Sequence, residues 1–148
     1  MKPFNLAFAG GQRGFTMLEV LISMIIIALG LLGYAGLQAV SLKNANTAYL
    51  RSQATMLSHD IVERMRVNRA VALTGSYNIS IGSNTGGSGI AGSDLAEWKT
   101  NLRQSLPAGD GRVDVRGVGV AEGIVEIIIQ WDDDGDGTPT SFVMQTHL

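Results

Sequence analysis

The pattern of hydrophobic positions changes near Lys43. From Val20 to Leu42 the sequence contains no Asp, Glu, Lys or Arg, and about 20 apolar residues at 1.5 Å each cross a hydrocarbon core roughly 30 Å thick. This run therefore predicts a membrane-spanning helix. Beyond it, apolar residues recur every three or four positions, as they do along one helical stripe. The stripe consists of Leu50, Ala54, Leu57, Ile61, Met65 and Ala72. No Pro or Gly interrupts residues 37–73, so one helix is expected to run to about Ala72.

The C-terminal part of the chain alternates between apolar and polar residues. Alternation and β-branched residues predict strands at residues 112–116, 124–131 and 141–146. A short turn at residues 121–123 favours antiparallel neighbours. The apolar positions of the middle strand lie on one face, which we expect to pack against the helical stripe. The predicted fold class is α+β: a lollipop in which a long N-terminal α-helix, membrane-spanning in its first half, packs on a small antiparallel β-sheet.

Between helix and sheet, residues 74–93 are rich in Gly, Ser and Asn and predict a flexible connection. Tyr77, Ile79 and Ile81 alternate within it and predict a short strand. Asp94 followed three residues later by Glu97 is typical of a helix start, and Pro107 ends the short helix that follows. This helix is expected to pack on the core.

Composition limits the classes of function. The chain has 148 residues, no Cys and a formal net charge of −2, so it offers no bulk positive charge or basic patch for nucleic acid. No motif pairs a nucleophile with a base, and His59 and His147 lie in unrelated elements. The sequence therefore predicts a protein that is not an enzyme, and it gives little support to nucleic-acid binding.

Glu19 stands at the start of the apolar run, where an ionised carboxylate needs a partner. Its cost at the bilayer centre is roughly 2.5–3.5 kcal/mol. Cleavage after Gly14 would free an α-amine on Phe15, four residues before Glu19 and therefore on the same face if this segment is helical. That amine, protonated at neutral pH, could neutralise Glu19 in its own chain or in a neighbouring one. Lys2 and Arg13 precede the run and predict a cytoplasmic N-terminus.

The stretch GFTMLE at residues 14–19, followed by a long apolar helix, resembles the class III signal of type IV pilins and type II secretion pseudopilins. The resemblance implies that a membrane aspartyl peptidase, the prepilin peptidase, cuts after Gly14 and methylates the new N-terminal Phe15. It also implies that Glu19 acts in assembly. The expected organisation is a leader at residues 1–14, a transmembrane and filament-core helix at 15–42, and a periplasmic α+β domain at 43–148.

Residues 30–38 and 54–68 further resemble the PilV-type minor pilins. This implies a non-catalytic minor subunit that takes part in assembly or priming of a type IV pilus, at the tip or in an initiation complex. The implied partners are other minor pilins, the major pilin and the inner-membrane assembly machinery. The implied location is the inner membrane, followed by the surface pilus. A minor pseudopilin of a type II secretion system and a tip module that binds a surface or DNA remain as alternatives.

An acidic run lies between the last two predicted strands. Asp132, Asp134 and Asp136, followed by Gly137, provide the D-x-D-x-D-G spacing of an EF-hand-like calcium loop. The match is incomplete, because Val143 stands where the bidentate Glu is expected. The alternative is a polar hairpin loop with solvated carboxylates. No other cofactor is expected, since His59 and Glu63, one helical turn apart, lack a third ligand and are better interpreted as a solvated helix face.

Overall fold

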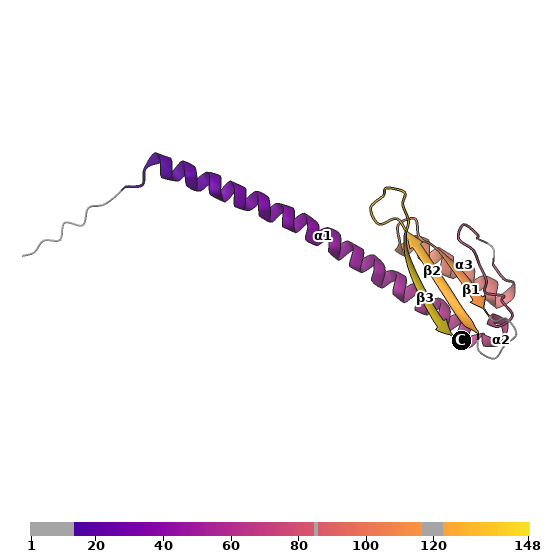
Figure 1. Ribbon diagram of the computed structural model, residues 1–148. Helices are drawn as coiled ribbons and strands as arrows, with labels where there is room; N and C mark the ends of the chain where they lie inside the picture. Colours follow the sequence, from indigo (N-terminus) through magenta and orange to yellow (C-terminus); the bar gives the residue numbers. More distant parts are fainter. Residues whose placement is uncertain (1–13, 85, 117–122) are drawn as a thin grey trace, which may run out of the picture. The chain divides into compact units, whose positions relative to one another are not determined.

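A computed structural model describes residues 14–84, 86–116 and 123–148 (Figure 1). In chain order its elements are α1 (Met17–Val67), α2 (Arg69–Ala72), α3 (Gly89–Ser105), β1 (Asp110–Arg116), β2 (Ile124–Trp131) and β3 (Thr140–His147). The chain divides into two compact units, Met1–Leu42 and Lys43–Leu148. The predicted leader, apart from Gly14, lies outside the described residues.

In the first unit, α1 is exposed at every position from Met17 to Leu42. Its start is fixed by Thr16, since the Glu19 N–H lies 3.0 Å from the Thr16 carbonyl and 3.3 Å from its Oγ1. This is the N-terminal half of a capping box, in which Thr and Glu stand three residues apart. By length and composition alone, α1 can cross a membrane.

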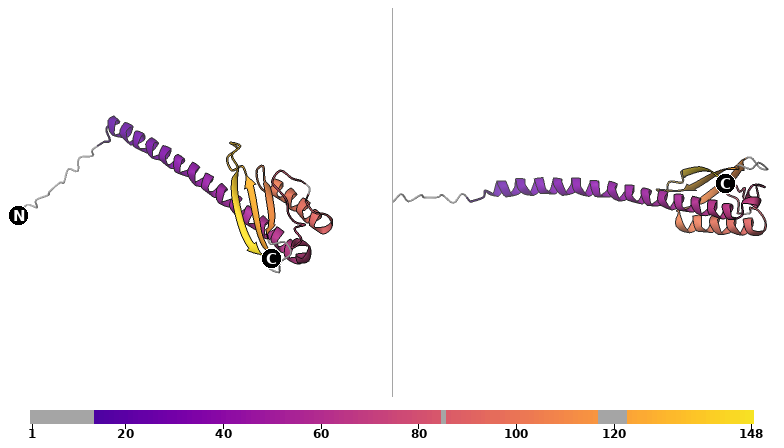
Figure 2. Two further views of the ribbon diagram at one scale, coloured as in Figure 1. Left: turned by 45° about the vertical axis from the view of Figure 1, so that its right-hand side comes forward. Right: turned by 90° about the horizontal axis from the view of Figure 1, so that it is seen from below.

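In the second unit, the part of α1 from Lys43 to Val67 and helix α3 lie on one side of the sheet (Figure 2). Both helices contribute to one hydrophobic core with the sheet. The core includes five α1 residues with at most 4% exposure: Leu50, Ala54, Ile61, Val62 and Met65. Four alternate residues of β2 are buried opposite them: Val125, Ile127, Ile129 and Trp131. Helix α3 packs beside α1, where Trp98 Nε1 donates to the Leu57 carbonyl at 2.9 Å. The predicted α+β fold class is confirmed.

The sheet has the order β1-β2-β3 and is antiparallel throughout. In its register, Ile127 lies between Val113 of β1 and Met144 of β3. The three predicted strands are confirmed to within two residues at each end. The predicted short strand around Ile79 is reduced to one antiparallel bridge with Val113. Of the turn predicted at residues 121–123, only Gly123 is described.

The prediction that one helix runs to Ala72 is wrong, because the helix breaks at Asn68. Asn68 leaves helical geometry, with φ −110° and ψ 41°, and its Nδ2 donates to the Tyr77 hydroxyl at 3.2 Å. An Asn side chain that bonds outside the helix competes with helical backbone geometry. The short α2 follows and buries Ala72.

The prediction that the next helix starts at Asp94 is also wrong, since α3 begins five residues earlier at Gly89. Its first turns are held by packing: Ala91 is fully buried, and a Cβ at Gly92 would lie 2.8 Å from the Gly87 carbonyl oxygen. Asp94 therefore lies inside the helix and accepts a hydrogen bond from the Tyr77 hydroxyl at 2.5 Å. The connection from α2 is correspondingly shorter than predicted.

Candidate assembly and metal sites

The segment before α1 carries the predicted processing site. Gly14, Phe15 and Thr16 precede the helix without regular structure, and Phe15 is 82% exposed. A Cβ placed on Gly14 would meet no atom within 4 Å. The peptide bond after Gly14 is thus sterically open in the single chain, and Gly there is not required by packing.

Glu19 lies in the first turn of α1, exposed, with its N–H capped by Thr16. A carboxylate is favourable there, because the helix dipole places positive partial charge at the N-terminus. Phe15 lies before the helix, so the sequence-based expectation that Phe15 and Glu19 share a helical face is not met in the unprocessed chain. Within the described ranges, Glu19 forms no ion pair.

The acidic loop, defined as residues 132–137, joins β2 to β3. One carboxylate oxygen from each of Asp132, Asp134 and Asp136 lies within 4.8 Å of the others, so the structure brings the three predicted ligands together. Backbone N–H groups also use these oxygens: Asp132 accepts from Gly135 at 2.8 Å and from Gly137 at 3.1 Å. The N–H of Thr138, 2.6 Å from Asp136 Oδ1, holds the pKa of Asp136 below its ordinary value.

The same loop is attached to α1 by contacts that the sequence analysis missed. Thr47 Oγ1 donates to Asp133 Oδ2 at 2.9 Å, and Lys43 Nζ lies 3.9 Å from Asp134 Oδ2. Lys43 and Thr47 are one helical turn apart and lie on one face. That spacing was a visible signal, but nothing local indicated that the loop, some 90 residues later, would meet it.

Two family models match the N-terminal part of the chain, including all of α1. Residues 10–35 match the prokaryotic N-terminal methylation motif, and residues 36–86 match the model of type IV pilin Tt1218. The two matches are contiguous and together cover more than half of the 148 residues. The chain belongs to the type IV pilins. The family is a structural one, which agrees with the predicted absence of enzymatic activity. No curated protein and no solved structure matches the chain significantly.

A buried ion pair holds the glycine-rich connection of this pilin, and the sequence analysis missed it too. The Lys99 side chain is 2% exposed and pairs with Asp110 at the start of β1. Lys99 also donates to the Ser80 carbonyl at 3.1 Å, and Asp110 accepts from the Gly82 N–H at 2.6 Å. Although burial opposes ionisation, Lys99 and the backbone N–H groups hold the pKa of Asp110 below its ordinary value.

A second charged network joins α1 of the pilin to α3. Arg64 donates to both carboxylate oxygens of Glu97, at 2.8 and 2.9 Å, and lies 3.3 Å from Asp94 and 3.2 Å from Asp60. The bidentate Arg64 lowers the pKa of Glu97. Burial and the bond to Asp94 raise the pKa of the Tyr77 hydroxyl. The network fixes the position of α3 and contains no reactive nucleophile.

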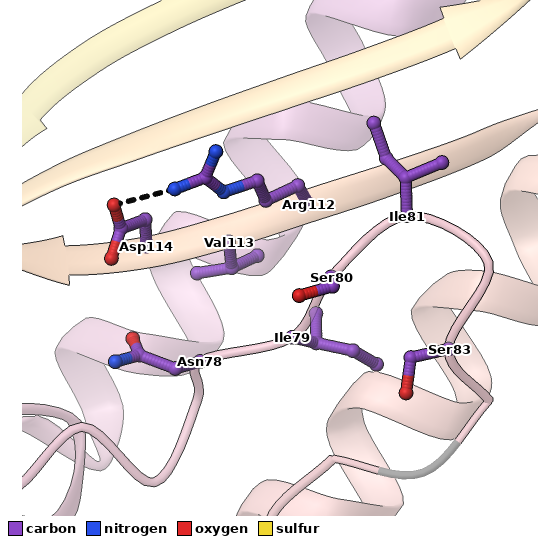
Figure 3. A pocket seen from close by; sticks show the side chains of 8 residues that line it. All are labelled: Asn78, Ile79, Ser80, Ile81, Ser83, Arg112, Val113 and Asp114. Carbon is purple, nitrogen blue, oxygen red and sulfur yellow. Dashed lines mark hydrogen bonds and ion pairs between the residues drawn. The ribbon is translucent and has the colours of Figure 1, made fainter.

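A polar hollow of about 580 Å³ lies between the glycine-rich connection and β1 (Figure 3). It is lined by Asn78, Ile79, Ser80, Ile81, Ser83, Arg112, Val113 and Asp114. Arg112 is engaged by Asp114 at 2.9 Å, and Asn78 Oδ1 accepts the Val115 N–H at 2.8 Å. Together with the Ile79 bridge to Val113, these contacts close the outer edge of β1.

Proposed function

We propose that this pilin is a minor subunit that takes part in assembly or priming of a type IV pilus, at the filament tip or in an initiation complex. The observation that carries this proposal is the match to the methylation motif. In that motif, Gly14 and Phe15 have no regular secondary structure and directly precede a helix with Glu19 in its first turn. The resemblance of residues 30–38 and 54–68 to PilV-type minor pilins supports the minor role.

The proposed pathway has two stages, processing in the inner membrane and assembly into the pilus. The prepilin peptidase removes residues 1–14 and methylates Phe15, while the helix at 15–42 holds the chain in the inner membrane and residues 43–148 fold in the periplasm. Lys2 and Arg13 support this orientation. The subunit then joins other minor pilins and the major pilin through the inner-membrane assembly machinery. Glu19 pairs with the amine of Phe15, in the same chain or in a neighbour.

The test of this function is deletion of the gene and quantification of surface pili, with tagged chain used to locate the subunit. The proposal expects a several-fold loss of pili, restored by the wild-type chain, and label at sparse positions or filament ends. Unchanged piliation with a loss of protein secretion would instead support a pseudopilin of a type II system. Label along the whole filament at the abundance of the main subunit would overturn the minor role.

We also propose that the acidic loop binds calcium through Asp132, Asp134 and Asp136. The proposal is supported by the closeness of the three oxygens and by Gly135 and Gly137, whose φ angles of 78° and 82° suit glycine. Each carboxylate oxygen has two lone pairs, so the N–H bonds leave room for a cation. Calcium would supply positive charge that relieves repulsion between the carboxylates.

A further inference from the structure

The polar hollow of about 580 Å³ beside β1 is built on an antiparallel pairing. Ile79 and Val113 exchange two backbone hydrogen bonds of 3.0 Å and bury their side chains in the core. Residues directly opposite each other in such a pair share a face, and the next residues along each chain point to the other face. The bridge therefore places two polar pairs on the outer face: Asn78 opposite Asp114, and Ser80 opposite Arg112.

All four of these side chains line the hollow (Figure 3) and keep hydrogen-bonding groups for a ligand. Asn78 accepts the Val115 N–H with Oδ1, and Arg112 donates to Asp114 Oδ2 at 2.9 Å. Within the described ranges, no hydrogen bond is formed by Asn78 Nδ2, by the Ser80 hydroxyl or by Asp114 Oδ1. The hollow thus offers a donor, an acceptor and a hydroxyl that can be either.

The charges of the hollow favour a neutral ligand. Its lining contains one guanidinium and one carboxylate, which pair with each other at 2.9 Å. An anion would have to displace Asp114 from Arg112, and a metal ion would find one carboxylate where several oxygen ligands are needed. An extended peptide cannot add to the sheet here, because the Ile79 bridge already occupies the edge of β1. Neutral molecules rich in hydroxyl groups fit these conditions.

We propose that the hollow binds a neutral saccharide. Each sugar hydroxyl both donates and accepts hydrogen bonds, which matches the free amide, hydroxyl and carboxylate groups. The C–H groups of a sugar ring need an apolar contact, and Ile81, at 39% exposure, provides one beside these groups. The volume of the hollow lies within the roughly 300–1,000 Å³ typical of small-molecule sites. Saccharide binding adds an attachment activity to the subunit.

This inference does not rest on the minor role or on pilus assembly. A chain that binds no saccharide leaves the pilus count on deletion unaffected. Conversely, a loss of pili on deletion says nothing about saccharide binding. The two proposals are therefore separable by experiment.

The binding test uses the full-length chain in a zwitterionic detergent, because alkyl glycoside detergents carry competing saccharide headgroups. Saturation-transfer NMR measures binding of glucose, galactose, mannose and N-acetylglucosamine, with glucuronate and glucosamine as charged comparators. We expect saturable binding of at least one neutral sugar. Both charged sugars should bind at least about fivefold more weakly, because their charged groups lose hydration without gaining a partner. No saturable binding of any neutral sugar, or equal binding of the charged ones, would overturn the proposal.

Variants of Ser80 test the location of binding. Ser80→Ala removes the hydroxyl but keeps the backbone carbonyl that accepts from Lys99, and it should weaken binding about three- to tenfold, as loss of one hydrogen bond does. Ser80→Phe fills the hollow and should abolish binding. Ser52→Ala and Ser52→Phe, at an exposed serine of α1, are the matched controls and should bind as wild type. Equal melting temperatures establish that the variants fold, and Ser80→Ala, which adds no bulk, decides if Ser80→Phe does not. Wild-type affinity in the folded Ser80 variants would overturn the site.

Discussion

The two halves of α1 have opposite relations to the rest of the chain. From Met17 to Leu42 every residue is exposed, whereas between Lys43 and Val67 the same helix buries Leu50, Ala54, Ile61 and Met65 in a core. The half from Lys43 to Val67 is stabilised by packing within its own chain. The half from Met17 to Leu42 presents an apolar surface that a membrane or neighbouring subunits can cover. A single helix thus joins a folded domain to an exposed apolar segment that we propose acts in assembly, and mutations in its two halves should have different kinds of effect.

The largest expected effect is at the processing site. Replacing Gly14 by a bulky residue such as Leu should abolish cleavage, so that the leader remains and the chain stays in the membrane as precursor. The reason is recognition by the peptidase, because packing leaves Gly14 free of contacts. Mass spectrometry of membrane-extracted protein should show a chain starting at methylated Phe15 in wild type and at Met1 in the variant. Normal processing of Gly14→Leu would contradict the prediction.

Glu19→Val should leave cleavage largely intact but lower incorporation into filaments by tenfold or more. The variant removes the carboxylate that we propose pairs with the Phe15 amine, and it introduces an apolar side chain that suits the membrane. Quantitative blotting of sheared pili against membrane precursor measures the ratio. Glu19→Asp, which keeps the charge, is the control and should retain more incorporation than Glu19→Val. Equal incorporation of Glu19→Val and wild type would remove the assembly role from Glu19.

The comparison of the two halves is tested directly by a matched pair of Ile→Ala changes. Ile61→Ala should lower the free energy of unfolding of the second unit by about 3 kcal/mol, since Ile61 has 0% exposure and the change leaves a cavity. Ile26→Ala, at a side chain 64% exposed, should change it by less than about 0.5 kcal/mol. Denaturant melts of the full chain in detergent measure both. Similar losses in the two variants would mean that the halves are not energetically distinct.

Asp110→Asn should destabilise the second unit by about 2 kcal/mol, because it leaves the buried Lys99 ammonium without a carboxylate. Loss of a partner from a fully buried pair costs about 3–5 kcal/mol, and Asp110 is 22% exposed, which reduces the cost. Since the pKa of Asp110 is lowered in the fold, its contribution is present above the unfolded-state pKa and is lost as pH falls through the folded-state value. A melt series below pH 4 should therefore be flatter for Asp110→Asn than for wild type.

The smallest expected effect is that of calcium on the acidic loop. If calcium binds only the folded chain, a tenfold excess over Kd raises the free energy of unfolding by about 1.4 kcal/mol. Thermal melts of the full chain with calcium or chelator should differ accordingly, and a variant with Asn at both Asp132 and Asp134 should show no difference. A wild-type melting temperature unmoved by millimolar calcium would leave the loop as a solvated connection held by its own N–H bonds.

Periodicity in the sequence predicts those parts of the fold that depend on one local pattern. The α1 stripe and the alternation in β2 could be read directly, since burial follows a period of 3.6 or 2 residues. The break at Asn68 and the start of α3 at Gly89 could not, because tertiary contacts with Tyr77 and the packing of Ala91 decide them.

For the candidate sites, the sequence provided residue types and spacing but few partners. The approach of Asp132, Asp134 and Asp136 followed from their closeness in one loop. The attachment of that loop to Thr47, and the pairing of Lys99 with Asp110, depend on tertiary placement that no window of sequence contains. Lys99 in particular appears from sequence as an ordinary solvated charge on a helix, and only its 2% side-chain exposure reveals its role.

The closed outer edge of β1 bears on whether the subunit aggregates before it is assembled. An open edge strand offers unpaired N–H and C=O groups to any passing extended chain and is a common starting point for aggregation. Here the Ile79 bridge, the Asn78 amide and Asp110, which accepts the Gly111 N–H at 2.8 Å, occupy three successive outward positions of β1. The glycine-rich connection and Asp110 together occupy this edge of the sheet, and we expect them to keep unassembled subunits from pairing with one another through β1.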